Sequence, residues 1–289
     1  MAKSDLNWKI YNKMLVSTLA PHCIRMEVGA IRALLNRSKA MLSRYTTCFD
    51  CKQRTEWWYI IKDDKMDFER IRTEFRTKIR KGLKNCVVCR IKPADHLDEL
   101  YEVYVKAFSR YKKTHMPISR AAFVNGSFSN GANETIEYWG VFLRENMKLV
   151  GYSICFVGHE YVDYSVTKYN PDYMSKRISD ALLYTMTFEY LNNQKVKYVS
   201  DGERSIRHET AIQEYLVKTF GFRKAYCRLN VIYKYHIKLL VFLIYPFRLL
   251  VGMFSVIPVM NDFHSLLEQE RIRRTFLKTR RLSEIWATC

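Results

Sequence analysis

Glycine, proline and acidic residues are all scarce in this chain of 289 residues. The 10 glycines and 6 prolines exclude a loop-rich or low-complexity organisation and favour many regular elements with short connections. Hydrophobic residues make up 48% of the chain and aromatic residues 14%, which excludes an intrinsically disordered protein. A chain of this length can bury a substantial core as one large domain or as two smaller ones.

The shortage of acidic side chains leaves the chain strongly basic. It has 48 lysines and arginines against 29 aspartates and glutamates, so the formal net charge is +19. Such an excess predicts a polyanionic partner, which is nucleic acid, an anionic membrane surface or a phosphorylated ligand. Net charge alone does not choose among the three.

The start of the chain also lacks an apolar run of signal-peptide length, so we expect a cytoplasmic protein with reduced thiols. Its 8 cysteines include two C-x-x-C pairs, Cys48/Cys51 and Cys86/Cys89, a pattern that zinc sites use. The second pair lies in Asn85–Ile91, however, which is typical of a strand. Residues three apart on a strand face opposite sides, so we expect ordinary thiols and no bound metal.

Hydrophobic periodicity predicts an α/β fold with a mixed sheet. Residues 5–50 are expected to be mostly helical. The later strands are expected at Trp57–Ile61, Asn85–Ile91, Glu137–Arg144, Met147–Val157, Tyr161–Lys168, Val196–Ser200 and Phe222–Tyr235. The later helices are expected at Asp67–Lys81, Asp95–Lys113, Ser119–Phe128, Ser175–Asn192 and Glu209–Phe220.

A row of basic residues runs along the predicted helix Asp67–Lys81 at a spacing of four. Its members are Arg72, Arg76, Arg80 and Lys84. Like charges at this spacing cost roughly a few tenths of a kcal/mol each in an isolated helix. Both a solvated face and an anion-binding face remain open interpretations.

Polar side chains gather in the loop that follows the predicted strand Val196–Ser200. In α/β proteins, ligands usually bind at the carboxyl ends of strands. The loop supplies acid, base and anion-binding groups in the form of Asp201, Glu203, Arg204, Ser205 and His208. Structural interpretations also remain open, with Asp201 in a plain turn with Gly202 and with Ser205 or His208 as the cap of the next helix.

A long apolar segment, Leu239–Met260, lies near the end of the chain. A straight helix of this length approaches the thickness of a bilayer core. Arg248 would cost about 2.5–3.5 kcal/mol at its centre, and Pro246 and Pro258 break it. We expect either an in-plane anchor on an anionic membrane surface, peripheral on the inner face, or a helical extension that covers the sheet.

Three stretches carry family-like motifs. Ile71–Ile91 is a helix-then-strand passage, Trp139–Tyr173 a hairpin with a following strand, and Tyr215–Phe222 reads YLVKTFGF. In this order they resemble the GNAT acyltransferase superfamily and, more closely, its Fem-type branch with two GNAT-like folds in one polypeptide. The resemblance covers roughly residues 55–235.

The resemblance implies a GNAT-like mixed sheet flanked by helices. It divides the chain into a partial N-terminal GNAT-like half at 1–92, a GNAT-like acyltransferase domain at 93–236 and a hydrophobic, basic helical extension at 237–289. It further implies acyl transfer to an amine, from acyl-coenzyme A in GNAT enzymes or from aminoacyl-tRNA in Fem-type ones.

We therefore expect an N-acyltransferase that uses acyl-coenzyme A and acts on an amine of a small molecule or of a cell-envelope or polysaccharide precursor. A transferase that depends on aminoacyl-tRNA, and thus on tRNA as a partner, is one alternative. A non-catalytic binding module on the same scaffold is the other, because a fold does not fix a function.

The expected chemistry assigns roles to residues. By analogy with the GNAT tyrosine, Tyr215 is expected to protonate the thiolate leaving group. Asp201, Glu203 or His208, just past the strand that lines the cleft, is expected to accept the amine proton. The pantetheine arm is expected along Tyr164, Ser165, Val166 and Thr167. The residues expected to bind the acceptor or a substrate anion are Arg110, Tyr111, Lys112, Arg204 and Ser205.

One departure concerns the phosphates of the donor. GNAT enzymes usually hold them in a glycine-rich turn, whereas the matching residues here contain no glycine, which makes close backbone approach harder. The positions concerned are Ser175, Lys176, Arg177, Ile178 and Ser179. The charges of Lys176 and Arg177 would have to hold the phosphates in place of that turn. The missing glycines make a donor that differs from acetyl-coenzyme A, or a bulkier one, more credible.

Overall fold

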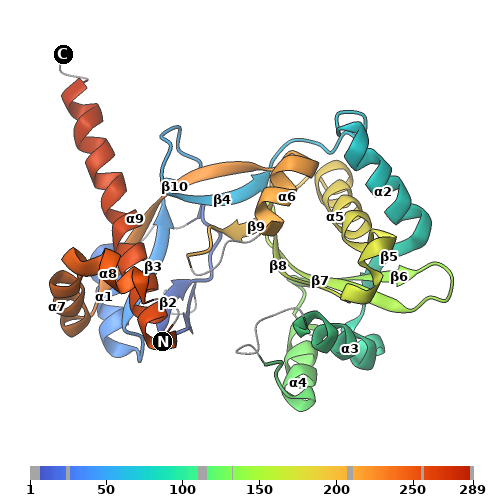
Figure 1. Cartoon of the computed structure of the whole chain (residues 1–289), viewed down its shortest axis with the longest axis horizontal. Coiled ribbons are helices and arrows are strands. Elements are labelled where there is room, and N and C mark those ends of the chain that lie inside the picture. Colours follow the sequence, from blue (N-terminus) through green and yellow to red (C-terminus); the bar gives the residue numbers. More distant parts are fainter. Residues whose placement is uncertain are drawn as a thin grey trace. The chain divides into compact units, whose positions relative to one another are not determined.

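The computed structural model describes residues 7–23, 27–109, 116–131, 133–206, 211–254 and 257–286. Its ten strands follow one another as hydrogen-bonded neighbours in the order β1-β2-β3-β10-β4-β9-β8-β7-β6-β5, with parallel and antiparallel pairs. Helices flank the strands (Figure 1). The predicted α/β class with a mixed sheet is therefore confirmed.

The chain divides into two compact units that interleave along the sequence. Unit 1 comprises Met1–Tyr59, Glu203–Ala211 and Lys224–Cys289, and unit 2 comprises Ile60–Gly202 and Ile212–Arg223. The three continuous ranges expected from the sequence remain a prediction, and each unit is described here by itself.

Unit 2 contains an antiparallel series that continues into one parallel pair. Its strands are β5 (Cys86–Ile91), β6 (Ile136–Leu143), β7 (Leu149–Val157), β8 (Tyr161–Tyr169) and β9 (Tyr198–Glu203). The first four pair antiparallel in sequence order, and β8 pairs with β9 in parallel. The sequence predicted each of these strands within a few residues, because short links and alternating apolar residues mark them clearly.

Helices cover both faces of these strands. They are α2 (Thr73–Asn85), α3 (Leu97–Phe108), α4 (Arg120–Gly131), α5 (Ile178–Phe188) and α6 (Ala211–Phe220), with 3-10 turns η2 (Pro93–His96) and η3 (Pro171–Lys176) and a π-helical turn η4 (Glu189–Asn193). Figure 1 shows α3 and α4 on one face of β6–β8, and α2 and α5 on the other. Ser119 accepts a hydrogen bond from the Ala122 amide, as the N-cap residue of a helix does.

Helix α2 begins later than the sequence predicted. Its first predicted residues form a turn instead, in which the Asp67 carboxylate accepts a hydrogen bond from the Glu69 amide at 3.0 Å. Aspartate favours such local turns over the helix interior, and this preference outweighed the apolar periodicity. The helix then continues to Asn85, directly before β5.

Unit 1 corrects the expectation that residues 5–50 are mostly helical. They form strands β1 (Trp8–Tyr11), β2 (Met14–Ser17) and β3 (Leu42–Thr47), and a single described helix, α1 (Val28–Arg37). Strands β1 and β2 make a hairpin, and β2 runs parallel to β3. Strands of four residues are too short for a period of two to be distinguished from a helical pattern.

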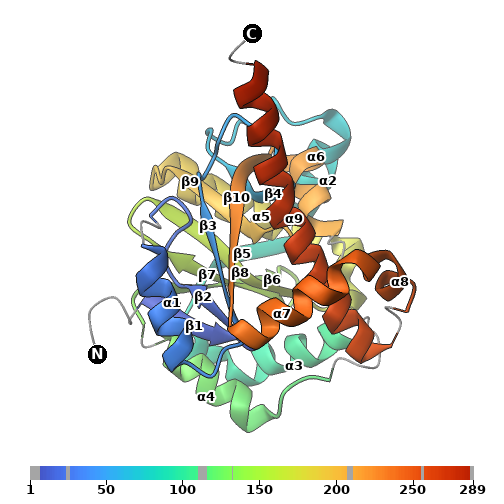
Figure 2. The same cartoon turned by 90° about the vertical axis from the view of Figure 1, so that its left-hand side faces the viewer.

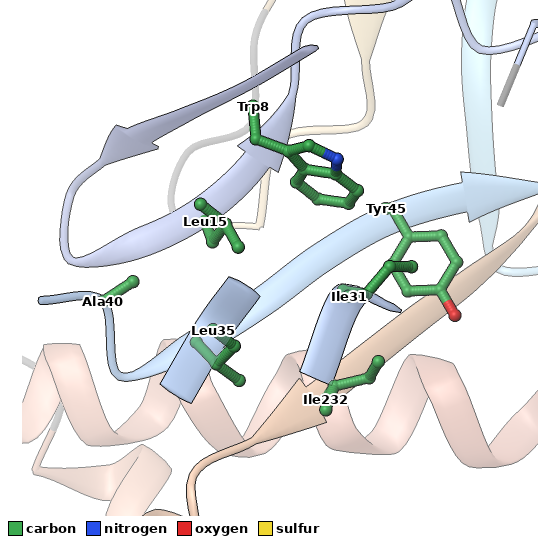
Figure 3. Close-up of a cluster of buried hydrophobic side chains, with 7 residues drawn as sticks. All are labelled: Trp8, Leu15, Ile31, Leu35, Ala40, Tyr45 and Ile232. Atoms are coloured by element: carbon green, nitrogen blue, oxygen red, sulfur yellow. The ribbon is translucent and has the colours of Figure 1, made fainter. Parts of the chain in front are cut away.

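Burial of apolar side chains explains why this unit folds as it does. Figure 3 shows the cluster formed by Trp8, Leu15, Ile31, Leu35, Ala40, Tyr45 and Ile232. Helix α1 contributes Ile31 and Leu35, four residues apart on one face and fully buried. Trp8 meets Tyr45 edge to face, with ring centroids 6.2 Å apart.

The last part of unit 1 is helical, and its apolar segment is broken, as Pro246 predicts. Strands β4 (Trp57–Lys62) and β10 (Arg223–Tyr233) precede α7 (Tyr235–Ile244), the 3-10 turn η5 (Tyr245–Phe247), α8 (Arg248–Met253) and α9 (Pro258–Trp286). Figure 2 shows α7 and α8 at the base of the long helix α9. By length and composition, Tyr235–Met253 is the one described segment apolar enough to cross a membrane.

Candidate active site

Strands β8 and β9 stop pairing partway along their length. Their parallel register joins Tyr161 to Tyr198 and ends with Asp163 opposite Ser200. Strand β8 nevertheless continues to Tyr169 and β9 to Glu203. A bulge lies on β8 at the same level, because β7 residues 154 and 155 pair with 166 and 164 and skip Ser165. Bulges interrupt pairing and redirect side chains, and they are frequent next to active sites.

Asp201 lies on β9, directly after the last paired residue. Burial raises the pKa of its carboxyl to about 7, and the nearby Asp163 carboxylate adds to this rise. A carboxyl with such a pKa exchanges its proton at neutral pH, which is the property that a general base requires. Of the acids predicted from the polar loop, Asp201 has the environment that fits the role.

Buried tyrosines surround this carboxyl. The Tyr169 hydroxyl is buried and has no hydrogen-bond partner among the described residues. Burial raises its pKa, and the charges of Asp180, Asp201 and Tyr215 raise it further. On the same strand, the Tyr164 and Thr187 hydroxyls are hydrogen-bonded at 3.0 Å, and burial likewise raises the pKa of Tyr164. An unpartnered buried hydroxyl is costly, so its presence indicates a place for a ligand or a proton transfer.

Tyr215, the predicted acid, donates a hydrogen bond to the carboxylate of Asp180. Burial raises the pKa of Tyr215, and the Asp180 carboxylate raises it further. Asp180 is itself 2% exposed and lies in the first turn of α5. The proton of Tyr215 is thus held by the Asp180 carboxylate and is not free for a leaving group.

Glu203 and Arg204 make ion pairs within unit 1. Glu203 pairs with Arg44 and accepts a hydrogen bond from the Tyr59 hydroxyl at 3.3 Å. Arg204 donates to the Glu56 carbonyl at 2.7 Å, and its guanidinium lies 4.6 Å from the centre of the Trp58 ring. These partners indicate structural roles, so the structure does not support Glu203 as the base. Ser205 belongs to the same unit.

The predicted pantetheine site on β8 has one strand edge paired and one unpaired. Val166 and Thr167 lie opposite Ile154 and Ser153 of β7. The opposite edge of Tyr164–Thr167 lies beyond the register with β9. Backbone amide and carbonyl groups on such an edge are available to pair with an extended ligand.

The start of α5 does not resemble an open phosphate cradle. Lys176 pairs with Glu145 at 3.3 Å, and Arg177 takes a left-handed conformation with φ of 63°. A Cβ added at Gly82 of α2 would lie 2.5 Å from the Arg177 carbonyl oxygen, so α2 packs directly on this turn. The first turn also holds the Asp180 carboxylate, at the position where a helix favours an anion. Ser175, Ile178 and Ser179 complete the segment, of which Ile178 is fully buried.

Several site residues escaped the sequence analysis, and others cannot be placed. Asp163 and Asp180 were missed, although Asp163 is the one acid in β8 and Asp180 the one acid in α5, which is a usable signal. Tyr169 was missed because its burial depends on tertiary packing. The predicted residues Arg110, Tyr111, Lys112 and His208 lie outside the described residues.

A cavity of about 480 Å³ lies elsewhere in unit 2, between β5, β6 and α5. Its lining includes Arg90, Trp139, Tyr184 and Glu189. Arg90 bonds the Glu137 carboxylate at 2.8 Å and lies 4.8 Å from the centre of the Trp139 ring. Asp201 is not part of this lining, so the cavity and the acid at the end of the β8–β9 register are separate features.

The second C-x-x-C pair, Cys86 and Cys89, differs in exposure as the strand geometry predicts. Cys86 is 2% exposed, and Cys89 on the same strand is exposed. Burial raises the pKa of Cys86 to about 11, so its thiol stays protonated at neutral pH. Within the described ranges, no group of three or more His, Cys, Asp or Glu side chains is placed to hold a metal ion.

Comparison with known proteins identifies the fold. No protein-family model matches the sequence, and no curated protein matches it. Among solved structures, FemX is 9% identical with a TM-score of 0.50, over 68% of this chain and 73% of FemX. The C-terminal domain of a protein assigned as a lysylphosphatidylglycerol synthetase, from Agrobacterium fabrum, is 10% identical with a TM-score of 0.51, over 82% of each chain. L-PGS from Bacillus licheniformis is 11% identical with a TM-score of 0.50, over 84% of each chain.

At these identities the likeness concerns the fold alone. The chain has a GNAT-like fold of the Fem-type branch, as the three motif-bearing stretches predicted. The unpaired edge of β8 and the partly buried Asp201 therefore lie in a fold like that of FemX.

Proposed function

We propose that the protein is an acyltransferase that moves an acyl group onto an amine, with Asp201 as the general base. The observation that carries this proposal is the Asp201 carboxyl, with a pKa of about 7, directly beyond the last β8–β9 pair. An amine is protonated at neutral pH and must lose a proton to attack a carbonyl. A carboxylate of this pKa is available at neutral pH and accepts that proton better than an ordinary aspartate.

In this mechanism the donor lies along the unpaired edge of β8. Backbone groups of Tyr164–Thr167 hold its arm in an extended conformation, with the acyl carbon near Asp201. The carboxylate takes a proton from the acceptor amine, which then attacks the acyl carbon. Amide groups of the same strand edge stabilise the oxyanion. The Tyr169 hydroxyl, which has no partner within the described part of the chain, gives its proton to the leaving group and regains one from the nitrogen of the tetrahedral intermediate as the amide forms.

Acyl-coenzyme A is the first candidate donor, and an amine of a small molecule or of a cell-envelope or polysaccharide precursor is the acceptor. The unpaired β8 edge suits a pantetheine arm. The GNAT-like fold supports this donor, and this chain would supply Lys176 and Arg177 as cations directly before α5. The Asp180 carboxylate in the same turn weakens a pyrophosphate site there, because like charges repel.

Aminoacyl-tRNA is the second candidate donor, and the surface of α2 favours it. Arg72, Arg80 and Lys84 are exposed and make no ion pair within the described ranges, whereas Arg76 pairs with Glu69. A row of exposed cations at a spacing of four along one helix suits a phosphate backbone. The Fem-type resemblance, which extends over most of the chain, implies the same donor.

A transfer assay with both donors tests the proposal. Purified full-length protein is incubated with radiolabelled acetyl-coenzyme A or with a pool of radiolabelled aminoacyl-tRNA, and with primary amines as acceptors. We expect transfer from one donor, and a rate about 100-fold lower in Asp201→Asn, the lower end of the usual loss for a general base. Asp98→Asn, at a carboxyl that is 80% exposed on α3, is the matched control and should keep the wild-type rate.

Three results count against parts of the proposal. A normal rate in Asp201→Asn with a large loss in Glu203→Gln would assign the base to Glu203. Activity with aminoacyl-tRNA that does not weaken with salt would contradict the α2 surface as its binding face. Absence of transfer from both donors, together with binding of either one, would favour a non-catalytic binding module.

A further inference from the structure

Helices α7 and α8 and the turn η5 between them expose a row of large apolar side chains, which we call the apolar face. Its members are between 49% and 82% exposed and are Tyr235, Leu239, Phe242, Leu243, Phe247, Leu249, Leu250 and Met253. Only 17% of the segment Tyr235–Met253 is buried. Many large apolar side chains exposed along one short segment mark a site of interaction.

The geometry of the segment favours a position in the plane of a membrane. Helix α7 has 10 residues and α8 has 6, and the turn η5 with Pro246 separates them. Each is shorter than the roughly 20 residues that cross a bilayer core. The inner side of the segment is anchored, because Ile237, Val241 and Val251 are buried with Leu267 of α9. A helix pair held in this way can place its outer side chains at the level of lipid headgroups.

A basic cavity of about 340 Å³ adjoins the apolar face. Helix α7 contributes to both, since Lys238, Val241 and Phe242 line the cavity. The cavity's basic residues come from four elements of unit 1 and are Arg32, Arg228, Lys238, Arg273 and Arg274. The one acidic residue in the lining is Glu270.

Glu270 neutralises only part of this positive charge. It is 2% exposed and accepts hydrogen bonds from Arg273 at 2.7 Å and from Arg274 at 2.6 Å. Burial raises its pKa, but the two guanidinium groups outweigh burial, so the pKa is lowered and the group stays ionised. Arg32, Arg228 and Lys238 form no ion pair within the described ranges. The cavity therefore keeps uncompensated cations, which suit a phosphate group.

We propose that this surface docks the protein on an anionic membrane, with the basic cavity holding the phosphate of an anionic phospholipid and the apolar face lying among the acyl chains. We choose a phospholipid as the occupant because the cations of the cavity complement its phosphate and because helix α7 contributes to both the cavity and the apolar face. An apolar surface alone would suit another protein, and a basic cavity alone would suit free phosphate or RNA. An anionic phospholipid supplies both partners, because its phosphate suits the basic cavity and its acyl chains suit the adjoining apolar face.

Vesicle sedimentation of the full-length protein tests the proposal. The probes are phosphatidylcholine vesicles with and without phosphatidylglycerol. We expect strong binding only with phosphatidylglycerol, and weaker binding as salt is raised. Phe242→Asp and Leu249→Asp on the apolar face, and the double variant Arg228→Gln/Lys238→Gln in the cavity, should each weaken binding about tenfold or more.

Matched controls keep the outcome interpretable. Met147→Asp places an acid at an exposed methionine in a turn of unit 2, with φ of 54°. Lys39→Gln removes an exposed cation of unit 1 outside the cavity. Both should bind vesicles like the wild type. The Tm of every variant is measured, and the two apolar-face variants remain informative separately if one of them unfolds.

Four outcomes would overturn the proposal. They are equal binding to both kinds of vesicle, wild-type binding by both apolar-face variants, wild-type binding by the cavity variant, and no binding to either vesicle. Stabilisation by inorganic phosphate in the absence of vesicle binding would identify a site for soluble phosphate. Binding of RNA that the cavity variant abolishes, without vesicle binding, would identify a nucleic-acid site.

Discussion

The carboxylate of Asp163, on the last residue of β8 that pairs with β9, raises the pKa of Asp201. The two acids are thus coupled at the point where the strands stop pairing. Burial is the larger cause of the raised pKa, and the Asp163 charge is the part that a substitution can remove without altering burial. The ionisable groups that interact electrostatically with Asp201 are Asp163, Tyr164 and Tyr169.

This coupling predicts a specific pH profile. A general base works only when deprotonated, so transfer activity should rise with pH through about 7, the pKa of Asp201. Asp163→Asn removes the neighbouring charge and should move the midpoint to lower pH, with the maximal rate retained. The profile of initial rates against pH measures both midpoints. An unchanged midpoint in Asp163→Asn would show that the group titrating in the profile is another one.

Asp201 should also lower the stability of the folded chain at neutral pH. Its folded pKa is raised above the unfolded value, so the folded state binds more protons, and stability falls as pH rises between about 4 and 7. Asp201→Asn removes this loss and should raise the free energy of unfolding at pH 8 by roughly 1–3 kcal/mol. Urea denaturation at pH 5 and pH 8 measures the effect. We expect the difference between wild type and variant to be smaller at pH 5, and an equal difference at both values would contradict the assignment.

The sequence predicted the fold far better than it predicted the site. The antiparallel strands β6, β7 and β8 were identified because alternation and short links are local signals. The ion-pair partner of Glu203 was not identified, because Arg44 lies 159 positions away along the chain. The role of Asp180 was missed for the same reason, because its hydrogen bond from Tyr215 joins two helices that no local pattern connects. Burial and pairing of polar groups depend on tertiary structure. Because burial and pairing set the pKa of each carboxyl, they decide which acidic residue can act as the general base.

The bond between Tyr215 and Asp180 should contribute to stability more than to chemistry. Tyr215→Phe removes the donor and leaves a carboxylate that is 2% exposed without its partner, which costs about 1–3 kcal/mol. Because the paired substitution Asp180→Asn retains a polar group that can bond the hydroxyl, it should cost less. Chemical denaturation of the two variants measures the difference. If Tyr215 is instead the acid that protonates the leaving group, Tyr215→Phe will lower the transfer rate about 100-fold or more with little loss of stability.

Gly82 should be a position where even one methyl group is too large. A Cβ there would lie 2.5 Å from the Arg177 carbonyl oxygen and 3.1 Å from the Ala181 amide nitrogen, both backbone atoms that cannot turn aside. Gly82→Ala must therefore separate α2 from α5, and we expect a loss of about 1–3 kcal/mol in the free energy of unfolding.

Gly29→Ala is the matched control for this substitution. Gly29 lies in α1, where an added Cβ would meet nothing within 4 Å. In an open helical position alanine is favoured over glycine, so this variant should gain roughly 0.5–1 kcal/mol. Urea denaturation of both variants measures whether each substitution raises or lowers the free energy of unfolding. A gain in Gly82→Ala equal to that in Gly29→Ala would mean that α2 and α5 are not packed closely at this turn, and the start of α5 would then have room for the phosphates of a donor.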